Sequence, residues 1–96
     1  MAELWLHTHM DPAKRAALLR DVREGGRLAS YGARYGEMFG AFMYLVDLYL
    51  RRRYGVTHAD LADFDWRAEH VSGNSPADAA NAALAAEDLL PPGLTR

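Results

Sequence analysis

Apolar residues recur along most of the chain with the three- to four-residue spacing of amphipathic helices. The spacing is clearest over residues 11–24, about 27–54 and 75–90, and a shorter segment from residue 57 reads the same way. The pattern predicts an all-α fold, a small helical bundle of about four helices. Ninety-six residues are the length of one domain, so we expect residues 1–96 to form a single helical domain.

Three of the four predicted helices, all but the central one, start at a residue of a type that caps helices. Asp11 precedes the first helix and Ser75 the last, which is expected to end at the Pro91-Pro92 pair. Thr57, with Asp60 three residues on, forms a capping box at the start of the short helix.

The segment from Arg27 to Tyr54 is expected to form one long central helix of roughly 40 Å. Its second half, "MFGAFMYLVDLYL", is apolar nearly all round, as in a helix that neighbours cover on every side. Two short partner helices are too few to cover it, so we expect a homodimer or higher oligomer.

Two short segments alternate between apolar and polar residues instead. "LWLHTH" near the start predicts a minor N-terminal strand. "DWRAEHVSGN", residues 65–74, is consistent with a short strand pairing with it or with an irregular loop.

Three glycines, Gly32, Gly36 and Gly40, lie four residues apart on one face of the predicted central helix. Each costs roughly 0.8–1 kcal/mol relative to alanine within a helix, so a compensating contact is expected. Small residues at this spacing allow another backbone to approach closely. The occupant of this groove is left open between the chain's own C-terminal helix, the same helix of a second subunit and a flat ligand.

A stripe of aromatic residues adjoins the glycines and is most simply part of the core, with a partner-facing surface as the alternative. The groove and the stripe together form the candidate surface for an oligomer or a partner, which comprises Tyr31, Gly32, Tyr35, Gly36, Phe39, Gly40, Met43 and Asp47.

Asp47 is the only charged residue within the longest apolar run. A buried carboxylate is a candidate general acid or base, or a ligand contact. Arg51 lies four residues on, so a structural ion pair within the helix is the simpler interpretation.

Metal and catalytic chemistry have weak support. His7 and His9 would point the same way on a strand, and His58 or His70 could complete a metal site. The chain has no cysteine, no HExxH motif and no GxSxG motif. We therefore expect no cofactor, no metal and no catalytic residue, and the sequence favours a protein that is not an enzyme.

The net charge of −2 divides unevenly, into +3 for residues 1–54 and −5 for residues 55–96. The small basic patch and the acidic second half make nucleic-acid binding unlikely. The longest apolar run has 13 residues where a membrane span needs about 20, and we expect no secretory signal because polar residues interrupt the first apolar segment. With cysteine absent, these features predict a soluble, cytoplasmic protein.

Together they favour a non-catalytic protein-interaction module, a small adaptor, assembly factor or inhibitor that acts as a homo-oligomer and binds another protein. The alternative is a small ligand- or metal-binding protein, or an enzyme, that uses Asp47 or His7 and His9.

Overall fold

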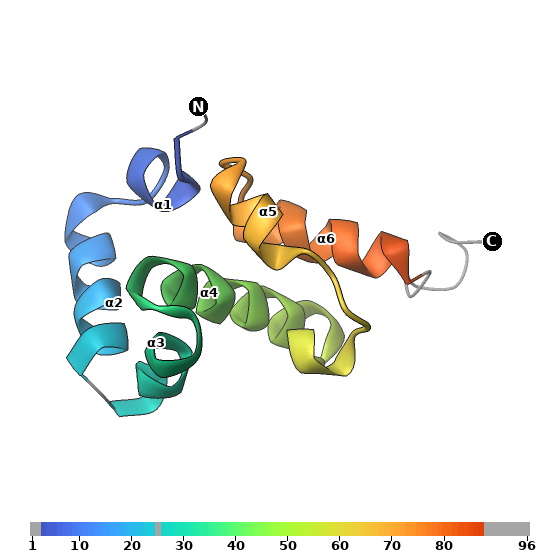
Figure 1. Cartoon of the computed structure of the whole chain (residues 1–96), viewed down its shortest axis with the longest axis horizontal. Helices are drawn as coiled ribbons and strands as arrows, with labels where there is room; N and C mark the ends of the chain where they lie inside the picture. Colours follow the sequence, from blue (N-terminus) through green and yellow to red (C-terminus); the bar gives the residue numbers. More distant parts are fainter. Residues whose placement is uncertain (1–2, 25, 88–96) are drawn as a thin grey trace.

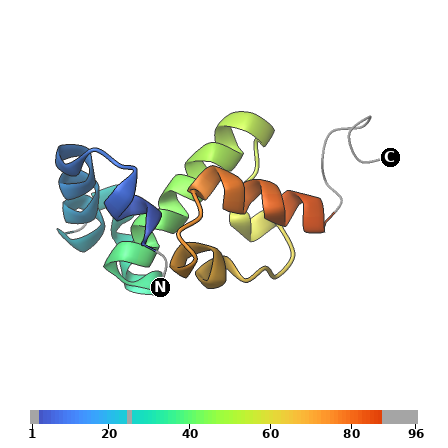
Figure 2. The ribbon, with the colours of Figure 1, turned by 90° about the horizontal axis from the view of Figure 1, so that it is seen from above.

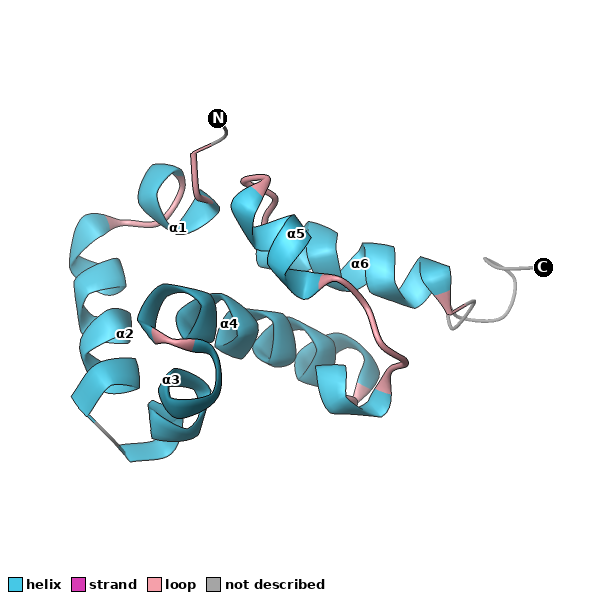
Figure 3. Cartoon of the chain, in the orientation of Figure 1, coloured by secondary structure: helices cyan, strands magenta, loops and turns pink. Residues whose placement is uncertain are grey.

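The computed structural model describes residues 3–24 and 26–87, and within them it contains helices and no strand (Figures 1 and 3). The predicted all-α class is therefore confirmed. The elements are α1 (Trp5–Thr8), α2 (Pro12–Glu24), the 3₁₀ turn η1 (Gly26–Leu28), α3 (Ala29–Tyr35), α4 (Glu37–Tyr54), the 3₁₀ turn η2 (His58–Asp60), α5 (Trp66–Val71) and α6 (Pro76–Ala86).

The predicted starts of the first and last long helices are confirmed. The Asp11 carboxylate accepts the Lys14 N–H at 3.1 Å before α2, and the Ser75 hydroxyl accepts the Asp78 N–H at 3.0 Å before α6. Each bond satisfies one of the backbone donors that a helix leaves free in its first turn. The predicted stop at Pro91-Pro92 lies outside the described residues.

The predicted N-terminal strand is wrong, because Trp5–Thr8 forms the short helix α1. In this form Leu6 is fully buried in the core. The Arg15 guanidinium of α2 donates to the carbonyl oxygens of Leu6 and His7, at 3.3 and 3.1 Å. Tertiary contacts of this kind override the weak preference of a six-residue alternating pattern.

The second ambiguous segment is also helical, so both the strand and the loop predicted for residues 65–74 are corrected by α5. Asp65 caps this helix, and its carboxylate accepts the Ala68 N–H at 3.1 Å. The helix buries His70, which is 5% exposed, against the rings of Phe39 and Phe42.

The single long central helix predicted over residues 27–54 is wrong as well. Gly36 interrupts it with φ +87° and ψ 174°, a conformation that is essentially restricted to glycine. The chain turns there, and α3 folds back against α4 (Figure 1).

The other two glycines of the trio are close-packing positions, with neighbours from within the chain. A Cβ atom on Gly40 would lie 2.7 Å from the carbonyl oxygen of Tyr31 in α3. A Cβ on Gly32 would overlap the carbonyl oxygen of Val22 in α2. The close contacts therefore join α2 to α3 and α3 to α4, instead of seating the C-terminal helix or a second subunit in a continuous groove.

Helix α4 lies at the centre of the molecule, in contact with α2, α3, α5 and α6 (Figures 1 and 2). The core is formed by its buried apolar side chains, by those of α1, α2 and η1, and by one face of α6; it comprises Leu6, Leu18, Val22, Leu28, Phe39, Ala41, Phe42, Met43, Val46, Leu50, Ala79, Ala80, Ala83 and Leu84. Among the described residues, no helix has both the length and the apolar character needed to span a membrane.

Candidate functional site

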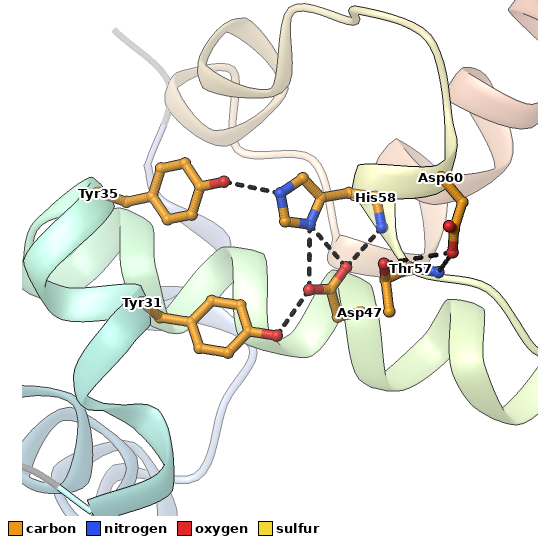
Figure 4. Close-up of polar contacts among 6 residues, drawn as sticks. All are labelled: Tyr31, Tyr35, Asp47, Thr57, His58 and Asp60. Atoms are coloured by element: carbon orange, nitrogen blue, oxygen red, sulfur yellow. Dashed lines mark hydrogen bonds and ion pairs between the residues drawn. The ribbon is translucent and has the colours of Figure 1, made fainter.

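A buried carboxylate forms the centre of the candidate site. Asp47 in α4 is 2% exposed and accepts hydrogen bonds from two other elements (Figure 4). The Tyr31 hydroxyl of α3 donates to Oδ2 at 2.6 Å. The His58 backbone N–H of η2 donates to Oδ1 at 2.7 Å, and the His58 ring Nδ1 lies 2.8 Å from the same oxygen.

The predicted Asp47–Arg51 ion pair is not among the ion pairs of the described residues. The partner of the carboxylate is His58, eleven residues on, and Arg51 is exposed to solvent. An exposed pair within one helix contributes only about 0.3–0.5 kcal/mol, so its loss is easily offset by three donors to a buried carboxylate.

Local structure after α4 explains how His58 reaches Asp47. Gly55 ends the helix with φ +70°, the left-handed conformation usual at helix ends. The predicted capping box then forms, with the Thr57 N–H donating to the Asp60 carboxylate at 2.9 Å. This turn directs both the backbone N–H and the ring of His58 back toward the last turns of α4 (Figure 4).

The His58 ring links the carboxylate to a second tyrosine. Its Nε2 lies 2.7 Å from the Tyr35 hydroxyl of α3. Because an ionised carboxylate only accepts hydrogen bonds, Nδ1 carries the proton that points at Asp47. In the neutral ring Nε2 is then the acceptor, and the Tyr35 O–H is its donor.

The two acidic groups at the centre have opposite pKa shifts. Burial alone would raise the pKa of Asp47, but the hydrogen bonds from His58 and Tyr31 outweigh it and hold the pKa below its ordinary value of 3.8. Burial and the hydrogen bond to Asp47 raise the pKa of Tyr31 to about 12, against a smaller opposing effect of Arg51. At neutral pH Asp47 is therefore a carboxylate and Tyr31 a neutral phenol.

A cavity of about 310 Å³ opens beside this network. It is lined by Ser30, Tyr31, Arg34, Tyr35, Asp47, Arg51, Thr57, His58 and Ala59. Arg34 and Arg51 are exposed, and neither belongs to an ion pair within the described part of the chain. The guanidinium of Arg34 lies 5.7 Å from the centre of the Tyr35 ring.

A second cavity, of about 360 Å³, shares Arg34, Tyr35, His58 and Ala59 with the first. Its remaining lining comes from the loop after η2 and the start of α5, namely Leu61, Ala62, Asp63, Phe64 and Trp66. The hydrogen-bonded Tyr35 and His58 side chains therefore border both cavities.

The eight residues of the candidate surface predicted from the sequence fall into two groups in the structure, those of the polar network and those outside it. Tyr31, Tyr35 and Asp47 converge on the polar network. Phe39, Gly40 and Met43 are buried, Gly32 packs against α2, and Gly36 is exposed at the break between α3 and α4.

His58 is the site residue that the sequence failed to connect with Asp47. The signal lies in Gly55 followed by the Thr57–Asp60 capping box, a helix stop and a tight turn within six residues. Such a turn folds His58 back over the end of α4. There its side chain can reach Asp47, which lies about two helical turns before the end of that helix.

The other histidines do not form a metal site with it. His7 and His9 lie on helix α1, so the strand geometry expected to align them is absent, and His9 stacks on Trp5 with ring centres 6.1 Å apart. Within residues 3–24 and 26–87, no three residues among histidine, cysteine, aspartate and glutamate are grouped so that they could hold a metal ion.

Comparisons of this chain with protein-family models, with curated proteins and with solved structures found no match. The chemistry of the site therefore rests on the geometry of its own residues.

Proposed function

We propose that the protein binds a small anionic molecule, one that carries a phosphate or carboxylate group, in the cavity beside Asp47. The observation that carries this proposal is that two exposed arginines, Arg34 and Arg51, line the cavity. The other polar groups beside them, those of Tyr31, Asp47 and His58, are already hydrogen-bonded to one another. It corresponds to the ligand-binding alternative that the sequence left open for Asp47.

The hydrogen-bond donors that line the cavity indicate which ligand charge the site favours. The hydroxyl protons of Tyr31 and Tyr35 point inward, to Asp47 and His58, so neither phenol offers a donor to the cavity. The guanidinium groups of Arg34 and Arg51 are the strong donors that remain, and their fork of N–H groups matches phosphate and carboxylate oxygens.

The walls and the volume restrict the ligand further. The two tyrosine rings provide apolar faces next to the arginines, which suits a ligand with a flat or apolar part attached to its anionic group. About 310 Å³ lies at the small end of the range for small-molecule sites, roughly 300–1,000 Å³.

Thermal unfolding in the presence of probe anions tests the proposal. Inorganic phosphate, a nucleoside monophosphate and benzoate sample the two anionic groups with and without a ring. At ten times its dissociation constant, a ligand stabilises a domain of this size by about 1.4 kcal/mol, which raises the melting temperature by about 6–11 °C.

Matched variants locate the binding site. Arg34→Gln and Arg51→Gln are expected to weaken binding of the best probe by about tenfold or more, because each removes a charge-assisted hydrogen bond. Arg52→Gln is the control, since Arg52 is an exposed neighbour on α4 that does not line the cavity. A melting temperature that none of the three probes raises at millimolar concentration would refute the proposal.

The interaction module predicted from the sequence, with its homo-oligomer, its protein partner and its cytoplasmic location, stays a prediction. Val71 is the exposed large hydrophobic residue of the described surface, at 51% exposure. Sedimentation velocity tests the oligomer directly, because a monomer has a mass of 10.7 kDa and the prediction requires a multiple of it.

A further inference from the structure

The two tyrosines of the site differ in the group that receives their hydroxyl proton. Tyr31 donates to the Asp47 carboxylate, at 2.6 Å. Tyr35 donates to the imidazole of His58, at 2.7 Å, and the other ring nitrogen of His58 contacts Asp47 at 2.8 Å (Figure 4). Only Tyr35 therefore donates to an imidazole nitrogen, the kind of group that commonly serves as a general base.

A hydroxyl, an imidazole and a buried carboxylate in this order form the arrangement by which proteins activate a hydroxyl nucleophile. The imidazole accepts the proton, and the carboxylate fixes the ring orientation and stabilises the imidazolium that forms. His58 is well placed for this role, because its side chain is 17% exposed while that of Asp47 is 3% exposed.

We infer that Tyr35 is a nucleophile that takes up a phosphoryl group from a phosphate ester, with His58 as the general base and Asp47 as a residue that positions His58. The phosphoryl class rests on the anion site proposed above, because Arg34 and Arg51 line the same cavity as Tyr35 and would neutralise the charge of the transferred group.

The step balances with the groups at the site. The Tyr35 Oη–P bond forms while the P–O bond to the leaving alcohol or phenol breaks. The phenolic proton passes from Tyr35 to His58 Nε2, and the imidazolium then protonates the leaving oxygen. Water can later cleave the phosphotyrosine with His58 again as base, which restores Tyr35 and releases inorganic phosphate.

Tyr35 is also accessible to a substrate. Its side chain is half-buried and borders both cavities, so a donor bound in either one lies next to Tyr35. Tyr31 serves as an internal reference in the same site, because its pKa of about 12 keeps its phenol protonated.

The first experiment uses p-nitrophenyl phosphate, followed by release of p-nitrophenolate and by peptide mapping for phosphorylated Tyr35. We expect the modification or the turnover in the wild type, its loss in Tyr35→Phe, and a decrease of about 10²–10⁴-fold in His58→Gln. Tyr49→Phe is the control and keeps the wild-type rate, because Tyr49 bonds to Asn81 away from the site.

The role of Asp47 is tested by the pH profile of Asp47→Asn, in a variant whose circular dichroism shows that it folds. Without the carboxylate that orients the base, attack depends on hydroxide-driven ionisation of the phenol, so the rate in Asp47→Asn should increase with pH more steeply than the wild-type rate. A profile that is unchanged in the variant would overturn the positioning role.

A second, uncharged probe separates this inference from anion binding. Benzenesulfonyl fluoride reacts with an activated phenol by forming an O–S bond and releasing fluoride, and it needs no arginine. His58-dependent sulfonylation of Tyr35 supports the nucleophile even where no anion raises the melting temperature. Sulfonylation of Tyr35 no faster than of Tyr44 overturns the nucleophile even where anions bind, and sulfonylation without any phosphorylation overturns the phosphoryl class.

Discussion

A single carboxylate, that of Asp47, holds together three elements of this fold. It accepts one hydrogen bond from α3 and two from η2, while its own backbone belongs to α4. A buried charge is costly unless its lone pairs are satisfied, and here each oxygen has a donor within 2.8 Å. The same contacts that stabilise the charge therefore position the Tyr31 and His58 side chains.

Removing this carboxylate should be strongly destabilising. Asp47→Ala leaves the Tyr31 hydroxyl and two His58 donors without an acceptor, so we expect the free energy of unfolding to fall by about 3–5 kcal/mol. Asp63→Ala, at an exposed position, should change it by no more than about 0.5 kcal/mol. Urea unfolding of both variants checks the difference; equal losses would mean that the Asp47 network adds nothing to stability.

The sequence was sufficient to single out Asp47, the lone charge in an apolar run, but not to find its partner. The four-residue rule selected Arg51, because that rule describes neighbours on an isolated helix. The actual partner follows a turn, and its position depends on Gly55 and on the capping box at Thr57. The exposed Arg51 remains free to line the cavity.

At the scale of the elements, capping residues predicted helices well, whereas short alternating patterns did not. The helices α2 and α6 begin at the capped positions expected of them. The two alternating segments form α1 and α5 instead, and each helix buries one side chain, Leu6 and His70. A short pattern contains too few residues to separate a period of 2 from one of 3.6.

The close packing around Gly40 predicts whether its replacement by alanine stabilises or destabilises the protein. Helix propensity alone would have Gly40→Ala stabilise α4 by about 0.8–1 kcal/mol. The close approach of the Tyr31 carbonyl oxygen, 2.7 Å from the added Cβ, is expected to outweigh this and to destabilise the protein by about 1–3 kcal/mol. A chemical denaturation curve decides between the two signs.

Two further variants separate packing from backbone effects. Ala33→Gly, at an exposed position of α3, reports propensity alone and should cost about 1 kcal/mol. Gly36→Ala meets no atom within 4 Å, so its expected cost of about 1–3 kcal/mol comes from the positive φ. If Gly40→Ala stabilised the protein, the close contact between the Tyr31 carbonyl oxygen of α3 and residue 40 of α4 would be contradicted.

For the whole molecule, stability rests on α4 and the helices that surround it, and two buried titratable groups make it depend on pH. Burial lowers the pKa of His70, with smaller effects of Arg67 and His7 in the same direction. The folded protein thus keeps His70 neutral while the unfolded chain takes up a proton below about pH 6.5. Asp47 acts at lower pH, because its stabilising effect is present above about pH 4 and is lost as the pH falls through its depressed folded pKa.

We therefore expect the urea midpoint to fall when the pH is lowered from 7.5 to 5.5, because the unfolded chain takes up a proton on His70 in this range while the folded protein resists it. His70→Phe should lose much of this dependence, since His70 Nδ1 is buried without a hydrogen-bond partner among the described residues and a phenyl ring suits the contacts with Phe39 and Phe42. His9→Gln, at an exposed position, is the control and should keep it. An undiminished pH dependence in His70→Phe would assign it to other groups.

All the residues that line the first cavity lie between Ser30 and Ala59. The lining of this cavity is thus encoded by one uninterrupted stretch of 30 residues. Every contact of the Asp47 network closes a loop of 23 residues or fewer, so the entropy lost in bringing its groups together is small. A substitution in α5 or α6 therefore replaces none of the residues that line this cavity, and its effect reaches the site through the packing of these helices against α4.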